Sequence, residues 1–142
     1  MQTATELHGQ CFCGRVQVRV KKALQPPVNC HCSQCRRLNG SAFTTGFSIK
    51  RDDVIISSED ALSAYHPTEL LKRHYCKFCG SPVWTLDQRQ PPIAGLHAGT
   101  FEGQELPIPK ADYFVSHKAG WYDIPVGSTC FGGETGFEPL HS

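Results

Sequence analysis

The sequence predicts a mainly β protein that forms a single domain over residues 1–142. Its apolar segments are short and are separated by turn-forming residues, with 13 Gly and 10 Pro in the chain. Short strands at close spacing are typical of all-β architectures, and no segment sustains a helical period beyond two or three turns. Seven of the eight cysteines fall in three clusters, which can join strands that are distant in sequence. We expect an ordered core over about 9–126, with flexible tails at 1–6 and 128–142.

The individual elements follow from local patterns along the chain. Residues 15–20 alternate polar and apolar side chains, which is the period of a half-buried strand. A Pro-Pro pair at 26–27 then interrupts regular structure. Residues 33–38 predict a short helical turn that ends at Gly40. Further strands are predicted at 42–49, 54–56, 62–65, 70–75, 83–86, 93–96 and 113–115.

Two cysteine clusters, Cys-x-Cys-Gly at 11–14 and Cys-x-x-Cys-Gly at 76–80, each end in a Cys followed directly by Gly. In a zinc knuckle the residue after the second Cys often needs a positive φ, which Gly adopts at low cost. Four thiolates complete the tetrahedral coordination of a structural zinc ion. Such an ion would join segments more than sixty residues apart, and it would offset the entropy of closing that loop. A redox Cys-x-x-Cys pair is the alternative, but no βαβ pattern supports it. We therefore predict a structural zinc with the ligands Cys11, Cys13, Cys76 and Cys79.

The third cluster, Cys30-His31-Cys32-Ser33-Gln34-Cys35, places three sulfurs within six residues. A strand followed by a turn can direct Cys30 and Cys32 to one side and return Cys35 to them. Three thiolates leave one zinc coordination position open, and a catalytic zinc needs that position. We predict Cys30, Cys32 and Cys35 as ligands of a second, catalytic zinc, which makes two Zn²⁺ per chain. His31 is expected to face outward or to support a neighbouring ligand rather than to bind the metal.

Charged residues near this triad are further candidates. Arg36 and Arg37 follow it directly and could bind a substrate carboxylate through bidentate hydrogen bonds, although a solvated Arg pair at a helix start fits equally well. His97 and His117 are candidate proton shuttles, but their strand-like surroundings favour a structural role. The alternative for the whole triad is a second structural site, whose fourth ligand would be Cys130, His97, His117 or Asp112.

Composition limits the classes of function. Lys and Arg number 14 against 13 Asp and Glu, giving a formal charge of +1, and no basic stripe marks a nucleic-acid binder. The first residues lack the basic and apolar regions of a signal peptide, and no apolar run is long enough to span a membrane. We expect a soluble, cytoplasmic protein with no nucleic-acid or membrane partner; a homo-oligomer is compatible with the sequence. In a reducing cytosol, clustered cysteines are more often metal ligands than disulfides.

Five motifs extend from Gly9 to Trp121, over most of the chain: Gly-Gln-Cys-Phe-Cys-Gly at 9–14, Cys-His-Cys-Ser-Gln-Cys-Arg-Arg at 30–37, Gly-Ser-Ala-Phe at 40–43, Cys-Lys-Phe-Cys-Gly-Ser-Pro at 76–82 and Ala-Gly-Thr at 98–100. In this order they resemble the glutathione-dependent formaldehyde-activating enzymes, a family that also includes centromere protein V. The resemblance implies a predominantly β fold with two zinc ions, held by the same four and three cysteines. The family's named reaction joins glutathione to formaldehyde, giving S-hydroxymethylglutathione, and is classed in reverse as a carbon–sulfur lyase. The chain departs from the family pattern at Asp112, where His is common, and at Gly120, where Pro often precedes the Trp.

The leading hypothesis is therefore a zinc-dependent enzyme of the carbon–sulfur lyase type. It would condense a small, glutathione-like thiol with an aldehyde such as formaldehyde at the three-cysteine zinc site. One alternative is a non-catalytic zinc scaffold that binds another macromolecule, which would present an exposed apolar or basic patch. A further alternative is a zinc enzyme that acts on another thiol adduct or carbonyl compound.

Overall fold

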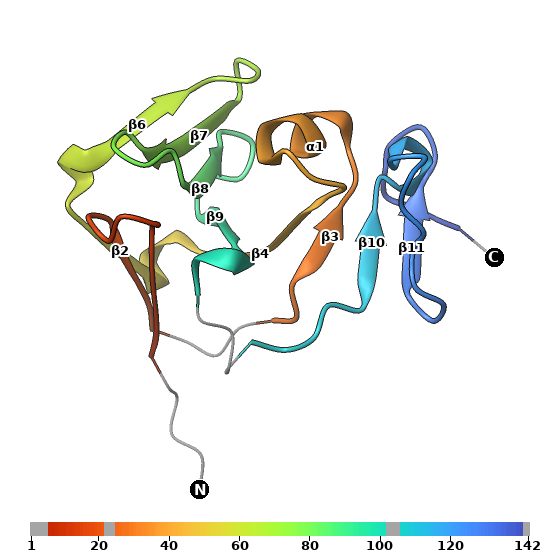
Figure 1. Ribbon diagram of the computed structural model, residues 1–142, viewed down its shortest axis with the longest axis horizontal. Coiled ribbons are helices and arrows are strands. Elements are labelled where there is room, and N and C mark those ends of the chain that lie inside the picture. The colour runs from red at the N-terminus through yellow and green to blue at the C-terminus, as the bar shows by residue number, and fades with distance from the viewer. Residues whose placement is uncertain (1–5, 22–24, 102–105, 141–142) are drawn as a thin grey trace, which may run out of the picture. The chain divides into compact units, whose positions relative to one another are not determined.

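The computed structural model describes residues 6–21, 25–101 and 106–140. Strands dominate these residues, which confirms the predicted mainly β fold (Figure 1). The chain divides into two compact units that are interleaved in sequence. The first unit consists of residues 1–25 and 47–106, and the second of residues 26–46 and 107–142. None of the helices in the described part of the chain has the length and apolar character needed to cross a lipid bilayer.

A three-stranded antiparallel sheet in the first unit has the order β1-β2-β5. Its strands are β1 (Leu7–Gln10), β2 (Gln17–Val20) and β5 (Val54–Ser57). Val18 and Val20 are buried while Gln17 and Arg19 are exposed. The alternation that predicted a strand at 15–20 therefore places its apolar side chains in the core. Strand β1 was not predicted, because its four residues show no alternation of apolar and polar side chains.

The remaining strands of the first unit run antiparallel to their neighbours in the order β9-β8-β7-β6, and β4 is the neighbour of β9. Strand β4 is the segment that continues from the second unit into the first. The strands are β4 (Thr44–Lys50), β6 (Leu62–Tyr65), β7 (Leu71–Cys76), β8 (Pro82–Asp87) and β9 (Ile93–His97). Three short 3₁₀ helices also belong to this unit: η1 (Arg51–Asp53) between β4 and β5, η2 (Glu59–Ala61) between β5 and β6, and η3 (Ala98–Thr100) after β9.

A cluster of buried apolar side chains forms the core of the first unit. Two cysteines belong to it, Cys11 and Cys76, which are 3% and 0% exposed. The cysteines at these two turns are therefore anchored in the core rather than held only by flexible loops. The other members include Val16, Val18, Val20, Phe47, Val83, Trp84, Leu96 and Phe101.

The second unit is built around a mixed sheet. Its elements are β3 (Val28–Cys30), α1 (Ser33–Asn39), β10 (Ala111–Tyr113), η4 (Val115–His117), β11 (Thr129–Gly132) and β12 (Glu138–Pro139). Strand β10 pairs in parallel with both β3 and β11, and β3 pairs antiparallel with β4. In this register Asp112 is the partner of Asn29 on one side and of Cys130 on the other. The parallel pairs thus bring together segments that lie far apart in the chain.

Two parts of the second unit differ from the sequence prediction. The strand predicted at 113–115 ends at Tyr113, because Phe114 adopts a left-handed conformation with φ 56° and η4 follows it. Strands β11 and β12 lie within 128–142, where the many glycines had suggested a tail without regular structure. Residues 1–5 and 141–142 of the predicted tails lie outside the described residues.

Candidate metal centres

Four thiols converge in the first unit. Cys11 and Cys13 lie in the turn between β1 and β2, and Cys76 and Cys79 lie at the turn between β7 and β8. The Sγ atoms of Cys11 and Cys13 are 3.6 Å apart, and those of Cys13 and Cys76 are 3.7 Å apart. All four sulfurs lie within 4.8 Å of one another. Four sulfurs at about 2.3 Å from a tetrahedral zinc are about 3.8 Å apart, whereas a disulfide requires about 2.05 Å. The set therefore has the dimensions of a zinc site. We refer to it as the four-thiol cluster.

Glycines shape both turns of the four-thiol cluster. Gly14 and Gly80 have φ values of 81° and 80°, in the left-handed region that other residues adopt at a cost. Each donates its backbone N–H to the first cysteine of its own turn, Gly14 to the carbonyl of Cys11 and Gly80 to that of Cys76. The positive φ expected after each Cys pair is confirmed at both positions. These turns aim the thiols of each pair toward the same point.

Hydrogen bonds give the four-thiol cluster thiolate character. Burial opposes ionisation of Cys79, but hydrogen bonds from the side chain and backbone of Ser81 lower the pKa of its thiol to about 5. The backbone of Arg15 likewise lowers the pKa of Cys13. Burial raises the pKa of Cys76, so this thiol keeps its proton in the absence of a cation. A bound metal ion replaces such shared protons, which is why metal binding to thiols is linked to proton release.

Three thiols converge in the second unit, at the junction of β3 and α1. Cys30 is the last residue of β3, Cys32 is the N-cap of α1, and Cys35 lies in the first turn of the helix. Their sulfurs lie within 4.8 Å of one another. Cys35 is buried, while Cys30 and Cys32 are half-buried, so the set is partly open to solvent. We refer to these residues as the three-thiol cluster.

The helix cap fixes the local geometry of the three-thiol cluster. The Sγ of Cys32 accepts a hydrogen bond of 3.2 Å from the backbone N–H of Cys35, as N-cap side chains do. The hydroxyl of Thr44 donates to the carbonyl of Cys35. Gly40 ends the helix with φ 65°, where the sequence predicted its end. A short helix therefore begins and ends at residues that hold the thiols in place.

Contacts among the thiols favour a thiolate on Cys32. The pKa of Cys32 is lowered to about 2, because its sulfur accepts hydrogen bonds from the thiols of Cys30 and Cys35. The same contacts raise the pKa of Cys30. A divalent cation would remove the remaining protons and bind three thiolates, and its fourth position would be free for another ligand. Both sets can hold a metal ion, and their donors suit zinc.

The four residues considered as a fourth protein ligand do not join the three-thiol cluster within the described chain. The carboxylate of Asp112 contacts His31 and Ser128, and the thiol of Cys130 donates to the carbonyl of Ser128. His117 lies on η4 with its ring centroid 6.5 Å from that of Phe114. His97 belongs to the first unit, where burial and the charge of Arg73 lower its pKa to about 4.

The two arginines beside the triad have different surroundings. Arg37 is exposed on α1, whereas Arg36 is half-buried. The Nε of Arg36 is buried and has no hydrogen-bond partner among the described residues. A buried guanidinium N–H without a partner costs free energy. Arg36 is thus the more enclosed of the two arginines, and Arg37 is the one open to solvent.

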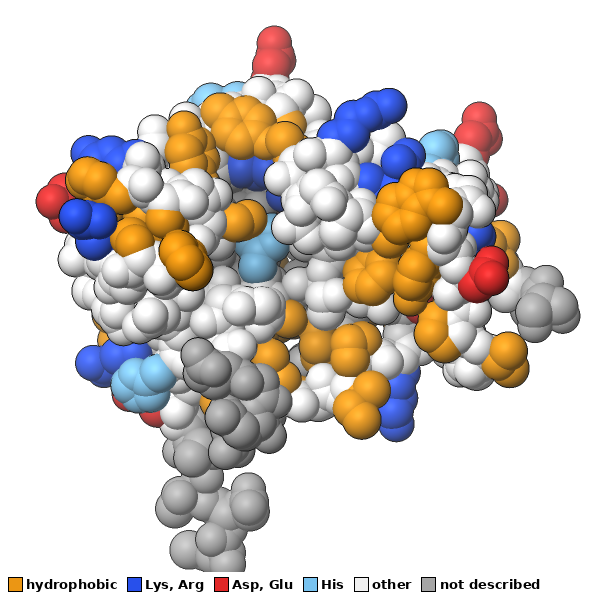
Figure 2. Space-filling view, in the orientation of Figure 1, with side chains coloured by type: hydrophobic (Ala, Val, Ile, Leu, Met, Phe, Trp, Pro, Cys, Tyr) orange, Lys and Arg blue, Asp and Glu red, His pale blue; other side chains and the backbone are white. Residues whose placement is uncertain are grey.

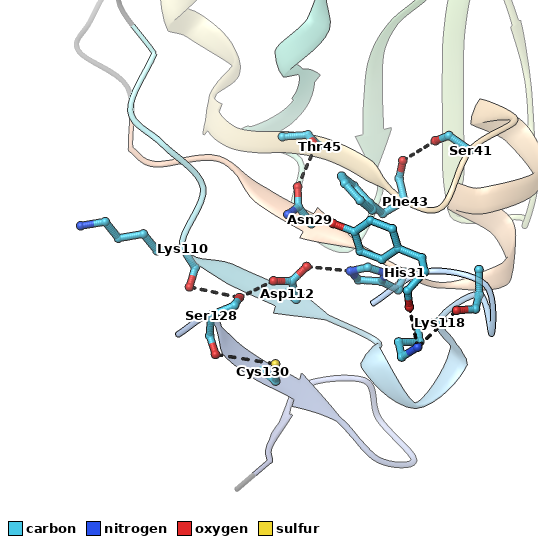
Figure 3. A network of polar contacts seen from close by, with 12 residues as sticks. Asn29, His31, Ser41, Phe43, Thr45, Lys110, Asp112, Lys118, Ser128 and Cys130 are labelled. Carbon is cyan, nitrogen blue, oxygen red and sulfur yellow. Dashed lines mark hydrogen bonds and ion pairs between the residues drawn. The ribbon is translucent and has the colours of Figure 1, made fainter. Parts of the chain in front are cut away.

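A buried polar network of the second unit includes His31, the residue between Cys30 and Cys32 (Figure 3). The side chain of His31 is fully buried, and its Nε2 is 2.7 Å from Oδ1 of Asp112. The hydroxyl of Ser128 donates to the other oxygen of the same carboxylate. Of the two orientations expected for His31, the outward-facing one is wrong, because the ring points into the second unit. Sequence reasoning had no signal for its partner, which lies 81 residues away.

Comparison with known proteins gives these features a context. The family model for glutathione-dependent formaldehyde-activating enzymes matches residues 6–117. A relative from Halomonas elongata is 29% identical over 138 residues, which cover 89% of this chain and 87% of that protein. A relative from Podospora anserina is 26% identical over 113 residues, which cover 75% of this chain and 53% of that protein. Both relatives carry the family's name as a provisional assignment.

A solved structure has a similar fold. The crystal structure of a Rhodobacter sphaeroides protein matches with a TM-score of 0.59 and 23% sequence identity, covering 72% of this chain and 98% of that chain. This likeness concerns the fold alone. The family match, by contrast, extends over most of the sequence and includes all seven clustered cysteines. The chain therefore belongs to the glutathione-dependent formaldehyde-activating enzyme family.

Proposed function

We propose that the protein is a zinc-dependent enzyme of the carbon–sulfur lyase type, which joins a small, glutathione-like thiol to an aldehyde such as formaldehyde. The observation that carries this proposal is the difference between the two thiol sets. Four thiols complete a tetrahedral site, but the three-thiol cluster leaves one position free. Family membership supports the same class of reaction.

Each thiol set has its own role in this proposal. Zinc at the four-thiol cluster would be structural, because it joins the β1–β2 turn to the β7–β8 turn. The second zinc would be held by Cys30, Cys32 and Cys35. When bound there, zinc supplies Lewis acidity, which lowers the pKa of a coordinated thiol and polarises a carbonyl group. The burial of Cys35 and the N-cap hydrogen bond of Cys32 would help to hold their sulfurs in place.

Arg36 would orient the thiol substrate. Glutathione carries two carboxylates, and a guanidinium binds a carboxylate through paired N–H groups. Arg36 directly follows Cys35 on α1, so its guanidinium is our candidate for this contact. Holding the thiol in place converts a bimolecular addition into an effectively unimolecular one, and this alone accounts for a large acceleration. Arg37, which is exposed, would contribute mainly through its charge.

A rate measurement above background tests the proposal, because thiols and formaldehyde combine without a catalyst. Exchange between free glutathione and its formaldehyde adduct is followed by NMR exchange spectroscopy on zinc-loaded protein. The wild type should increase the exchange rate, and Cys32→Ser should return it to the uncatalysed value. Cys130→Ser is the matched control, because this thiol lies outside both clusters, and it should retain the wild-type rate. Wild-type exchange no faster than background would contradict the proposal.

A non-catalytic scaffold is the second candidate, and one observation favours it. Several large apolar side chains are exposed in the second unit, including Ile108, Trp121, Val126 and Phe137, which are 77%, 75%, 105% and 61% exposed. Figure 2 shows apolar side chains gathered over the region where Figure 1 places β10 and β11. A scaffold would show no triad-dependent turnover with any thiol or aldehyde. An enzyme for another thiol adduct or carbonyl compound would respond to a broader screen of both substrates.

The thiol sets and the exposed surface also bear on the location and assembly of the protein. The thiolate sets require a reducing environment, so we infer a cytoplasmic protein. A homo-oligomer is compatible with the exposed apolar side chains of the second unit. Size-exclusion chromatography with light scattering measures the oligomeric state directly.

A further inference from the structure

The side chains of His31, Asp112 and Ser128 form a buried chain of hydrogen bonds in the second unit (Figure 3). The side chains of His31 and Asp112 are only 0% and 3% exposed, and the distance from Nε2 to Oδ1 is 2.7 Å. The Ser128 hydroxyl donates to Oδ2 of Asp112. Both carboxylate oxygens thus have a partner. A buried pair of this kind persists only where the surrounding structure holds it, because burying polar groups is costly.

His31 occupies a special place in the chain, between two cysteines of the three-thiol cluster. Successive side chains of an extended segment point to opposite sides, so Cys30 and Cys32 face one way and His31 the other. The backbone N–H of His31 donates to the carbonyl of Tyr113 at 2.9 Å. Its ring packs against those of Phe43 and Tyr122, with centroid distances of 5.1 and 6.0 Å. The imidazole is therefore fixed on several sides.

The order of these hydrogen bonds rules out a catalytic triad with Ser128 as the nucleophile. A serine nucleophile is activated when its hydroxyl donates to an imidazole that a carboxylate orients. Here the carboxylate is in the middle, and the Ser128 hydroxyl donates to Asp112 rather than to His31. His31 cannot take the proton of Ser128 in this arrangement. The chain of contacts is thus suited to orient His31, not to generate a nucleophile.

We propose that Asp112 is a positioning residue, which acts through His31 to fix the backbone of Cys30–Cys32 so that the three thiols converge on one metal ion. This inference rests on the proposed zinc at the three-thiol cluster. Anchoring His31 on β10 ties the ligand segment to a strand that is far away in sequence. Without that anchor the Cys30–Cys32 segment can rotate about its backbone, and the three sulfurs no longer point toward one metal position. Residues behind metal ligands typically change metal affinity by about 10- to 100-fold when they are removed.

The test measures metal binding rather than activity. Apo wild type and variants are titrated with Co²⁺, whose visible bands report the geometry of thiolate sites, and Zn²⁺ affinity is measured by competition with a chelator. Asp112→Ala should lower the zinc affinity of the three-thiol cluster by about tenfold or more and change its cobalt bands. The four-thiol cluster in the same molecule should bind as before, and it serves as an internal check of folding.

Two further variants separate positioning from a general loss of structure. Asp112→Asn keeps an oxygen for His31 and offers an N–H to the oxygen of Ser128, so it should restore wild-type affinity and bands. Ser128→Ala removes one support of the carboxylate and leaves the His31 contact, so it should have an intermediate effect. It also provides the measurement if Asp112→Ala does not fold.

A matched control is the contact between Thr45 of β4 and Asn29 of β3, which lies two residues before His31. The hydroxyl of Thr45 donates to Oδ1 of Asn29 at 2.7 Å, a contact of the same length that does not involve His31. Thr45→Val should change the zinc affinity by less than about threefold. Wild-type affinity in both Asp112→Ala and Ser128→Ala, or an equal loss in Thr45→Val, would overturn the positioning role. Wild type that binds only one equivalent of metal would instead overturn the proposed function, and this inference with it.

Discussion

The four-thiol and three-thiol clusters differ in how the chain brings their sulfurs together. The first draws on two turns that are 63 residues apart, and two of its cysteines lie in the hydrophobic core. The second draws on six consecutive residues, shaped by the end of a strand and the start of a helix. A metal ion at the first therefore closes a long loop, whereas at the second it closes a very short one. The same donor atom thus occurs in a set of four that can complete a tetrahedral site and in a set of three that cannot.

The largest effect is expected from Cys76→Ser. This side chain is 0% exposed, and it contributes both a metal ligand and part of the core. Zinc binding by small structural sites contributes about 10–16 kcal/mol, which exceeds the total stability of most domains. The variant should lose its structural zinc and unfold near room temperature, as measured by circular dichroism and zinc content. A cooperative thermal transition close to that of wild type would show that the four-thiol cluster is not needed for the fold.

The same substitution in the other cluster should have a much smaller effect on stability. Cys32→Ser removes a ligand from a loop of six residues, whose closure entropy is small. We expect one zinc per chain instead of two, and a thermal midpoint lowered by about 4 °C or less. Differential scanning calorimetry and elemental analysis on the same sample measure both quantities. Equal destabilisation by Cys32→Ser and Cys76→Ser would mean that both clusters are structural.

A pH series can separate acid effects on the first unit from loss of its metal. Burial and Arg73 lower the pKa of His97 to about 4, against 6.5 in the unfolded chain. The unfolded state therefore binds the proton first, and stability is lost as the pH falls from 6.5 toward 4. Between pH 7 and pH 5, the protonation of His97 in the unfolded state lowers the free energy of unfolding by about 2 kcal/mol. Urea unfolding of wild type and His97→Gln, both loaded with zinc, should show a flatter pH dependence in the variant. Parallel curves would contradict the assignment.

The smallest effect concerns the turns that aim the thiols. Gly80 has φ 80°, and a Cβ added there would meet no atom within 4 Å, so Gly80→Ala adds backbone strain without a clash. We expect a loss of about 1 kcal/mol in the free energy of unfolding. Gly99→Ala is the matched control, because its Cβ also has open space and its φ lies outside the positive region. Urea unfolding measures both, and equal effects would argue against strain at Gly80.

Much of the fold was predictable, because most strands carry local patterns. The segments at 54–56, 62–65, 83–86 and 93–96 all form strands, and the short helix begins at Ser33 as predicted. Strands β1, β3, β11 and β12 were missed. These are two to four residues long, and their pairing rather than their sequence makes them strands.

The candidate site was likewise predictable only in part. Cysteine spacing predicted both thiol sets, and the glycines that follow Cys13 and Cys79 supported the prediction of the four-thiol cluster. The partner of His31 could not be predicted from the sequence. Asp112 meets it only through the parallel pairing of β3 with β10, and the register of that pairing has no local signature. The end of β10 could not be predicted either, because the left-handed position after it is occupied by Phe114 and not by the usual Gly or Asn.

The sulfur of Cys32 that caps α1 has a consequence for handling the protein. Its low pKa makes it a thiolate when no cation is bound, and thiolates are the form that attacks electrophiles. Aldehydes and alkylating reagents can therefore modify this cysteine in metal-free samples. Modification of the sulfur would weaken the hydrogen bond that it accepts from the backbone N–H of Cys35. Full zinc loading before exposure to formaldehyde would thus protect this thiolate from reaction with the protein's own proposed substrate.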